Sequence, residues 1–488
     1  MPTSDHTASR ASGAGGAAAT AHPRATRAAV DVLQDGGSAV DAAIAAQAVI
    51  CVVMPQAAGI GGDVLALVHD REGVAAVNGT GLSPRGLSAP PATTGGSSVA
   101  VPGLVDGWVT LHARWGRLPL EAVLTPAIAL AADGLTPDQG LVAAVRRQRD
   151  RLEAGGASGW SLLSAARGDD GTTWVQPELA ELLRQVVSTG RDAVYAGPHA
   201  AALVAAVRRC GGSLDLRDLA EHQTPCPPPL TVAWGEGHVH VQPPMSQGVL
   251  LAMALRKVRQ LMGDGPVDDH LLVEVVGAVF AHRSSCRRGA ELLDVELTVD
   301  PTRASGRGGP RSYLHTAGVA TVDRAGQVVS SLISVFDDFG SGVFVPELGI
   351  VVNNRAAGFT DGDNAPAPAK RPVHTLAPAM VTSPAGVLGV ATPGADGQVQ
   401  TLLQVLTATL AGRSLPEAVG ALRWRSQDGD LLLEAGHPAH GTLTARGHQV
   451  VPVPVGDGVF GSVVAAGTHP VPHAVADWRR DSDTRGVA

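Results

Sequence analysis

Thr316 is the residue of this chain whose surroundings most clearly permit nucleophilic chemistry. The segment 303–312 before it is rich in Gly, Ser and Arg and has no hydrophobic pattern, so we predict a linker. Val319–Val322 and Gln327–Ser334 are β-rich runs on either side of residues 323–326, which predicts a hairpin just after Thr316. Cleavage before Thr316 would give its hydroxyl group a neighbouring α-amine of pKa about 8, which can accept the hydroxyl proton near neutral pH. On spacing alone, a structural threonine after a loop is the commoner interpretation.

The rest of the sequence predicts the elements that must position this residue. Residues 1–20 are rich in Ala, Gly, Ser and Thr and develop no apolar face, so we predict a flexible tail. Small and aliphatic residues from Ala25 to Val53 predict two helices, broken at the glycines of residues 35–38. Val64–Val68 and Val74–Val77 then read as paired strands. Helical patterns follow at 104–114, 120–133, 177–187, 200–209 and 400–410. This mixture predicts an α/β fold.

The composition excludes several classes of function. The formal charge of −8 argues against a nucleic-acid partner, because a phosphate-binding surface needs clustered cations. The lysines are Lys257 and Lys370, and neither lies in a phosphate-loop or Ser-x-x-Lys motif. The 4 cysteines are widely spaced, so we expect neither a disulfide nor a metal site. Neither a signal-peptide core nor a membrane span is evident, so we expect a cytoplasmic protein without membrane contact. The sequence implies no metal, nucleotide or other cofactor.

Three other motifs allow competing interpretations. His238 and His240 would share one face of a strand and could hold a metal ion, but no third ligand is evident. The glycines of residues 59–62 suggest a phosphate loop, yet the dinucleotide spacing and a lysine are missing, which favours a tight structural turn. The Gly-x-Ser-x-Gly elbow of serine hydrolases is absent, so Ser341 and Ser462 are interpreted as turn residues.

Short blocks spread along the chain add a further signal. In the first part they are residues 35–43, 54–62, 101–103, 116–119, 126–128, 243–248 and 269–274. In the second part they are Thr316 with residues 322–326, then 339–342, 352–354, 370–372, 392–394 and 477–481. Together, from about His22 to Ala488, these blocks and their order resemble the γ-glutamyltransferase family. One glycine motif alone would be weak, but so many ordered blocks are a strong signal.

This resemblance implies the four-layer αββα sandwich of the N-terminal-nucleophile hydrolases, an α/β (α+β) fold. It also implies that the precursor cuts itself between His315 and Thr316. Residues 21–315 would then form a large-subunit region and residues 316–488 a small-subunit region. The two chains would stay associated as a heterodimer and act as one continuous catalytic unit.

The resemblance further implies a role for particular residues. Thr316 would attack an amide or related carbonyl of a small molecule, and water or an acceptor amine would release the resulting acyl-enzyme. Ser334 falls where the family has a second hydroxyl residue that supports the nucleophile. Backbone N–H groups near Gly394 and Ala395 would stabilise the oxyanion.

The pocket for the γ-glutamyl head group is altered in this sequence. The positions concerned are Thr80, Phe336, Arg355, Gly358, His374 and Thr375. Where the family has an arginine, this sequence has Thr80, and where the family has an acidic pair, it has Ala357-Gly358, after Arg355. His374-Thr375 replace a pair of serines of the family, and Phe336 replaces an asparagine. Burying a zwitterionic head group without its charged partners would cost several kcal/mol, so ordinary glutathione hydrolysis becomes doubtful. Arg355 and His374 could instead serve a differently charged substrate.

Two alternatives stay open. One is a cytoplasmic biosynthetic enzyme that cleaves a C–C bond next to a carbonyl, as expected for relatives that form alkylproline-type units of antibiotics. The other is an unprocessed, non-enzymatic protein that uses the old pocket for binding. Such a protein would remain a single chain after purification, with Thr316 unlabelled.

Overall fold

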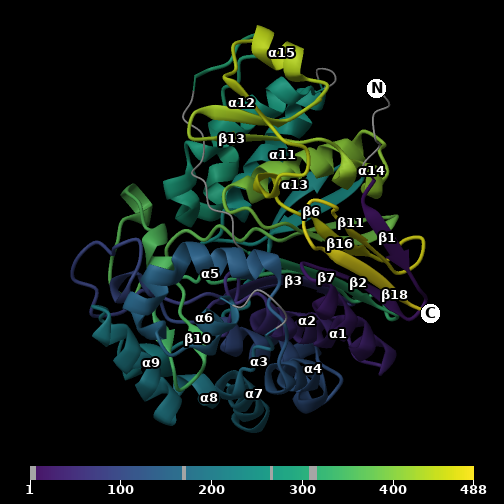
Figure 1. The fold of residues 1–488 in the computed structure, drawn as a ribbon. Helices are drawn as coiled ribbons and strands as arrows, with labels where there is room; N and C mark the ends of the chain where they lie inside the picture. Colours follow the sequence, from purple (N-terminus) through teal and green to yellow (C-terminus); the bar gives the residue numbers. More distant parts are fainter. Residues whose placement is uncertain (1–6, 168–171, 264–266, 307–315) are drawn as a thin grey trace.

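Two antiparallel β-sheets lie face to face in the middle of the molecule (Figure 1). The computed structural model describes residues 7–167, 172–263, 267–306 and 316–488. Among them, one sheet has six strands, in the order β18 (Asp483–Val487), β2 (Gly16–Thr20), β7 (Ala317–Asp323), β8 (Val328–Ser334), β3 (Asp63–Asp70) and β4 (Gly73–Gly79). The other has seven, in the order β1 (Ser9–Ser12), β17 (His473–Ala476), β16 (Val464–Gly467), β12 (Gly386–Ala391), β11 (Ala379–Ser383), β6 (Gly237–Val241) and β5 (Leu230–Trp234). Apolar side chains such as Leu65, Val322 and Met380 fill the space between them.

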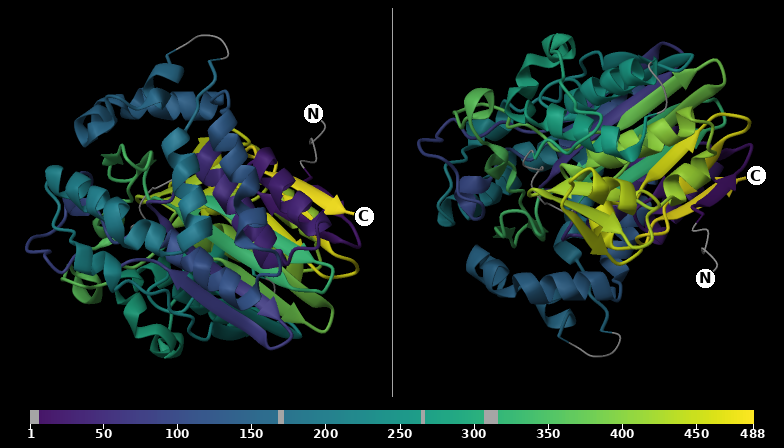
Figure 2. Two further views of the ribbon diagram at one scale, coloured as in Figure 1. Left: turned by 90° about the horizontal axis from the view of Figure 1, so that it is seen from below. Right: turned by 90° about the horizontal axis from the view of Figure 1, so that it is seen from above.

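Helices cover the outer face of each sheet and complete four layers (Figure 2). The helices on the six-stranded side are α1 (Pro23–Gln34), α2 (Ala39–Val53), α3 (Leu104–Trp115), α4 (Leu120–Asp133) and α7 (Pro177–Thr189). Those on the seven-stranded side are α11 (Gly248–Gly263), α12 (Asp269–Phe280), α13 (Gly397–Leu410) and α14 (Leu415–Gly420). The layers therefore follow the order αββα, which confirms the predicted fold class.

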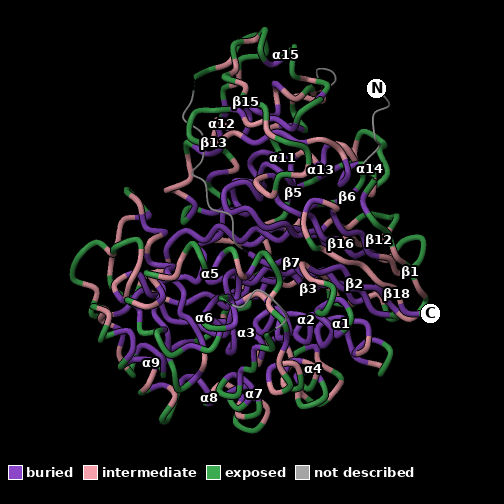
Figure 3. The backbone as a smooth tube through the Cα atoms, viewed as in Figure 1, coloured by how far each residue is buried: buried purple, intermediate pink, exposed green. Residues whose placement is uncertain are grey.

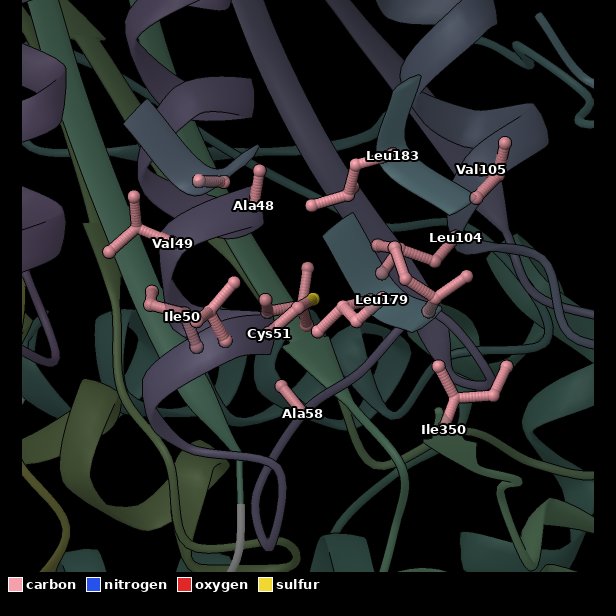
Figure 4. Close-up of a cluster of buried hydrophobic side chains, with 14 of the residues drawn as sticks. Ala48, Val49, Ile50, Cys51, Ala58, Leu104, Val105, Leu179, Leu183 and Ile350 are labelled. Atoms are coloured by element: carbon pink, nitrogen blue, oxygen red, sulfur yellow. The ribbon is translucent and has the colours of Figure 1, made fainter. Parts of the chain in front are cut away.

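Helix α2 is the centre of the helical layer on the six-stranded side. Every residue of α2 is buried, as expected for a helix that is apolar on all sides. Ser38 caps it, and the Asp41 side chain closes a capping box by accepting the Ser38 N–H at 2.9 Å. Figure 4 shows residues 48–51 of α2 in one apolar cluster with side chains from α3, α7 and β10 (Ile350–Val351). Helix α2 also packs directly on β7 and β8, and so holds the helical layer against the sheet next to Thr316.

The prediction of a flexible tail over residues 1–20 is wrong for the part of it that forms strands. β1 pairs with β17, and β2 lies between β18 and β7 with every residue buried. Ala18 faces the helical layer, whereas Ala17 and Ala19 face the other sheet. Small side chains that look featureless in the sequence are suited to a strand covered on both faces, because neighbouring layers leave little room. Residues 1–6 lie outside the described residues.

Most other predicted elements are confirmed. The helical pattern of residues 25–53 does break at Asp35 to Ser38, and the predicted pair of strands forms β3 and β4. The hairpin after Thr316 forms β7 and β8, with Ala317 opposite Ile333. Of the predicted linker, residues 307–312 lie outside the described residues, as does His315.

A small three-stranded sheet packs on the helices of the seven-stranded side. Its strands are β13 (Trp424–Gln427), β14 (Asp430–Glu434) and β15 (Val450–Val453), and α15 (His440–Ala445) precedes β15. In Figure 3 the central strands are largely buried, and exposed residues concentrate on the outer helices and loops. None of the helices that the structure describes has the length and apolar character needed to cross a bilayer.

Candidate active site

Three neighbouring strands bring polar residues to one end of the six-stranded sheet. Thr316 directly precedes β7, Ser334 ends β8, and Asp63 begins β3. The register places Ala317 beside Ile333 and Asp63 beside Ser334. Thr316 is only 4% exposed, and its hydroxyl oxygen lies 3.3 Å from that of Ser334. The structure thus brings the two predicted hydroxyl residues into contact.

The glycines of residues 59–62 allow the chain to approach this site closely. A Cβ atom on Gly61 would lie 2.2 Å from the carbonyl oxygen of Val351, and one on Gly62 would lie 2.4 Å from that of Ser334. A real Cβ atom cannot lie so close to a carbonyl oxygen, so only glycine fits at these two positions. These glycines therefore serve as a tight turn that packs against β8 and β10, in agreement with the structural interpretation.

Beside Ser334, Asp63 forms a buried cluster with Arg355 and His374. The Asp63 carboxylate accepts a hydrogen bond from Arg355 Nε at 2.8 Å and lies 3.0 Å from His374 Nε2. The three residues are at most 2% exposed. The Leu376 N–H group donates to His374 Nδ1 at 3.2 Å, which places the imidazole proton on Nε2, facing Asp63. The substituted head-group positions 355 and 374 therefore share one carboxylate.

The charges of this cluster follow from burial and pairing. Burial alone would raise the pKa of Asp63, but the His374 hydrogen bond and the Arg355 charge outweigh it and lower that pKa. Burial, assisted by the Arg355 charge, lowers the pKa of His374 to about 4. At neutral pH the cluster is therefore a carboxylate, a guanidinium ion and a neutral imidazole, with no net charge.

Arg355 retains hydrogen-bonding capacity beyond this pair. Its Nη1 and Nη2 atoms are buried and have no hydrogen-bond partner among the residues that the structure describes. Its guanidinium carbon lies 4.4 Å from the centroid of the Phe336 ring, and the Phe336 N–H donates to the Ser334 hydroxyl at 2.9 Å. Phe336 has φ 85°, in the left-handed region. A Cβ atom on Gly358 would lie 3.9 Å from the Phe336 ring, so this glycine borders the same group.

Thr80 does not replace the charge of the family's arginine. Its hydroxyl group donates to Asn78 Oδ1 at 2.5 Å, and its carbonyl oxygen accepts from Arg371 Nε at 2.9 Å. Because Gly79 is paired with Val64, Thr80 lies at the same end of the sheet as Asp63. Arg371 is thus the cation that lies next to the substituted position.

The predicted oxyanion residues lie in the loop between β12 and α13. Gly394 has φ 123° and Ala395 has φ 48°. Gln247 Nε2 donates to the carbonyl oxygens of Thr375 at 2.5 Å and Ala395 at 2.7 Å, which ties this loop to the segment that carries His374. A Cβ atom on Gly318 of β7 would lie 3.7 Å from that of Ala391, the last residue of β12. The loop therefore emerges beside the beginning of β7.

Sequence reasoning missed Asp63 and Gln247. Asp63 had one visible signal, an acidic residue between a glycine turn and a buried strand. Gln247 lies in a block that resembles the family but carried no assigned role. The alternative metal site at His238 and His240 gains no support, because both ring nitrogens of His240 lie 2.9 Å from threonine hydroxyl groups.

A helix-covered sandwich of two sheets, with a buried threonine at the start of an inner strand, is the architecture of the N-terminal-nucleophile hydrolases. The chain belongs to the gamma-glutamyltranspeptidase family, whose model matches residues 25–487. It is therefore an enzyme of the γ-glutamyltransferase-like branch of that class.

Individual relatives give a consistent result. The oxamate amidohydrolase proenzyme of Klebsiella pneumoniae is 32% identical over 84% of this chain and 84% of its own length. The glutathione hydrolase proenzyme of Bacillus subtilis is 27% identical over 97% of this chain and 92% of its own length. The crystal structure of cephalosporin acylase from Bacillus halodurans has a TM-score of 0.84 and 26% identity, and covers 100% of this chain and 98% of that one. These relatives imply a self-processed hydrolase or acyltransferase made of two associated chains.

Proposed function

We propose that Thr316 is the nucleophile of this enzyme and that the chain cuts itself between His315 and Thr316. The observation that carries this proposal is the position of Thr316, buried at the start of β7 with its hydroxyl oxygen 3.3 Å from that of Ser334. Cleavage would separate residues 1–315 from residues 316–488 and leave Thr316 with a free α-amine. An amine of pKa about 8 is a suitable base for the adjacent hydroxyl group.

In the proposed reaction, Thr316 Oγ1 attacks a carbonyl carbon of the substrate while the α-amine accepts the hydroxyl proton. Backbone N–H groups at Gly394 and Ala395 hold the negative charge that develops on the carbonyl oxygen. Collapse of this intermediate breaks the amide C–N bond, and the departing amine receives the proton from the α-ammonium group. Water then attacks the ester at Thr316 with the α-amine as base, releasing the acid. An acceptor amine in place of water would complete an acyl transfer instead.

We infer that the substrate is a small amide with a carboxylate close to the scissile carbonyl. Arg355 supports this inference, because its Nη1 and Nη2 atoms are buried without a partner among the described residues. Leaving such groups without a hydrogen bond costs about 1–3 kcal/mol, and more for a charged group, which a bound carboxylate would offset. The similarity to an oxamate amidohydrolase points in the same direction.

The test is a substrate panel with mapping of the acyl group. Oxamate and related carboxylated amides, together with a γ-glutamyl anilide, are incubated with the enzyme while ammonia or amine release is followed. The acid-quenched protein is then digested, and the masses of its peptides are measured by mass spectrometry. We expect release from the carboxylated amides and an acyl adduct on Thr316. The Asp63→Asn/Arg355→Met double variant should lose the preference for a carboxylate, and the exposed Arg287→Met control should keep it.

Three results would contradict this proposal. Faster turnover of the γ-glutamyl compound would refute the inferred substrate class. A shortened carbon skeleton without amine release would instead identify the second candidate, cleavage of a C–C bond next to a carbonyl in a cytoplasmic biosynthetic pathway. An adduct on a residue other than Thr316 would refute the assigned nucleophile.

A further inference from the structure

Two histidines and a glutamate meet outside the Thr316 site, between α12 and the loop after α15. His270 and Glu274 are one turn apart on α12, and His448 precedes β15. One possible ligand atom from each residue lies within 4.8 Å of the others. His270 is 1% and Glu274 is 4% exposed, whereas His448 is half-buried. The cluster is thus built from buried groups and remains reachable from solvent through His448. Figure 1 shows α12 and α15 together at the top of the molecule.

The hydrogen bonds of His270 fix the direction of its free electron pair. Its Nε2 atom lies 2.8 Å from the carbonyl oxygen of Asp300, and a carbonyl oxygen can only accept, so Nε2 carries the proton. Its Nδ1 atom therefore presents a lone pair toward His448 Nε2, at 2.8 Å. A ring N–H bound to a backbone carbonyl, with the other nitrogen aimed at a shared point, is the arrangement that orients histidine ligands of metal ions.

Glu274 supplies an oxygen atom to the same place. Its carboxylate accepts hydrogen bonds from the N–H and the hydroxyl group of Ser305, the N–H at 3.1 Å. A carboxylate can accept about four hydrogen bonds, so Glu274 can hold Ser305 and an ion together. Burial lowers the pKa of His448, which favours its neutral form. A neutral imidazole is the form that binds a metal.

We propose that His270, Glu274 and His448 form a binding site for one zinc ion. Two imidazole nitrogens and one carboxylate oxygen are a ligand set that suits zinc better than magnesium or calcium, which prefer oxygen ligands. Zinc–nitrogen bonds of about 2.0–2.1 Å in a tetrahedral site put the two nitrogens about 3.3 Å apart. Rotation of the half-buried His448 ring provides the extra half ångström or so. The proton on His448 Nε2 moves to Nδ1 through solvent, and water completes the coordination.

This zinc ion would connect the two chains that processing produces. His270 and Glu274 precede Thr316, and His448 follows it. Other contacts at the same place cross this boundary: the Ala304 N–H donates to the Arg446 carbonyl oxygen at 2.7 Å, and Arg446 Nη1 lies 2.6 Å from Asp268. The connecting role rests on the proposed cleavage before Thr316, whereas zinc binding itself does not.

The binding test uses chelator-treated full-length protein. The protein is incubated with zinc chloride and desalted, and its zinc content is measured by mass spectrometry. In a parallel sample cobalt is added instead, and the visible absorption of a tetrahedral site is recorded. We expect about one zinc per molecule, counted as one precursor or one pair of processed chains. The affinity should be at least about tenfold weaker in His448→Ala and in Glu274→Gln. The control His440→Ala alters an exposed histidine of α15 outside the cluster and should bind zinc like the wild type.

The outcomes separate this proposal from the proposed function. Two results would overturn the zinc proposal: equal zinc binding in His448→Ala and the wild type, or no retained zinc in the wild type. The two histidines would then form only an N–H···N hydrogen bond. The same measurement on Thr316→Ala should give full zinc binding whether or not that variant is cleaved. In processed wild type, zinc removal should promote dissociation of the two chains on dilution, and unchanged association would refute the connecting role.

Discussion

Asp63 is the counter-ion of the buried cluster beside Ser334, because the buried Arg355 and His374 both contact its carboxylate. The substitution Asp63→Asn keeps the shape of the side chain and removes its charge. Removing one partner of a buried ion pair leaves the other charge uncompensated and typically costs about 3–5 kcal/mol. We therefore predict that this variant loses about 3–5 kcal/mol of unfolding free energy. The double variant Asp63→Asn/Arg355→Met should regain most of that loss, because neither charge remains buried.

The measurement is urea unfolding followed by tryptophan fluorescence at pH 7. Asp31→Asn is the matched control, because Asp31 also pairs with an arginine, Arg27 Nε, at 2.9 Å, but with both side chains substantially exposed, 43% and 65%. An exposed pair of this kind contributes at most about 1 kcal/mol. A cost below about 1 kcal/mol for Asp63→Asn, or a double variant no more stable than the single one, would refute the assignment of Asp63 as the counter-ion of Arg355.

Two other predictions concern neighbouring residues. Ser334→Ala removes the hydroxyl group that lies 3.3 Å from Thr316 Oγ1, so the rate of chain cleavage and kcat should each fall about 10–100-fold. A gel time course measures the cleavage rate and steady-state kinetics measure kcat. Unchanged rates would contradict a role of Ser334 beside the nucleophile. His374 has a folded pKa of about 4, below its ordinary 6.5, so between these pH values the unfolded chain binds a proton that the native protein does not. Stability should therefore fall as the pH drops from 6.5 toward 4. The free energy of unfolding, measured at several pH values, should change less steeply with pH in His374→Gln than in the wild type, by up to about 1.4 kcal/mol per pH unit. An identical slope in the two proteins would argue against a buried neutral imidazole.

The elements next to Thr316 were predictable from the sequence because their signals are local. The two β-rich runs around residues 323–326 predict the hairpin. Once it forms, the residue before β7 and the last residue of β8 must be neighbours. The helix break at Asp35 to Ser38 is equally local, since glycines end one helix and a capping box starts the next. The order of the family-like blocks supplied the αββα arrangement.

The remaining features depend on contacts between distant segments. Asp63, Arg355 and His374 come together only through the register of β3 with β8 and the course of the loops that follow. In the zinc proposal, His270 and Glu274 are visible as a pair on one helix, but His448 joins them only through tertiary packing. Strand β2 was missed for another reason: its alanines and glycine carry no periodic signal, and only the layers on both sides explain why they are buried.

Whether Thr316 becomes an N-terminal nucleophile can be decided from the intact mass and the N-terminal sequence of the purified protein, measured beside Thr316→Ala. We expect two chains in the wild type, one of them beginning at Thr316, and a single chain of 49.5 kDa in the variant. A single chain of 49.5 kDa in both samples would contradict it and favour an unprocessed binding protein.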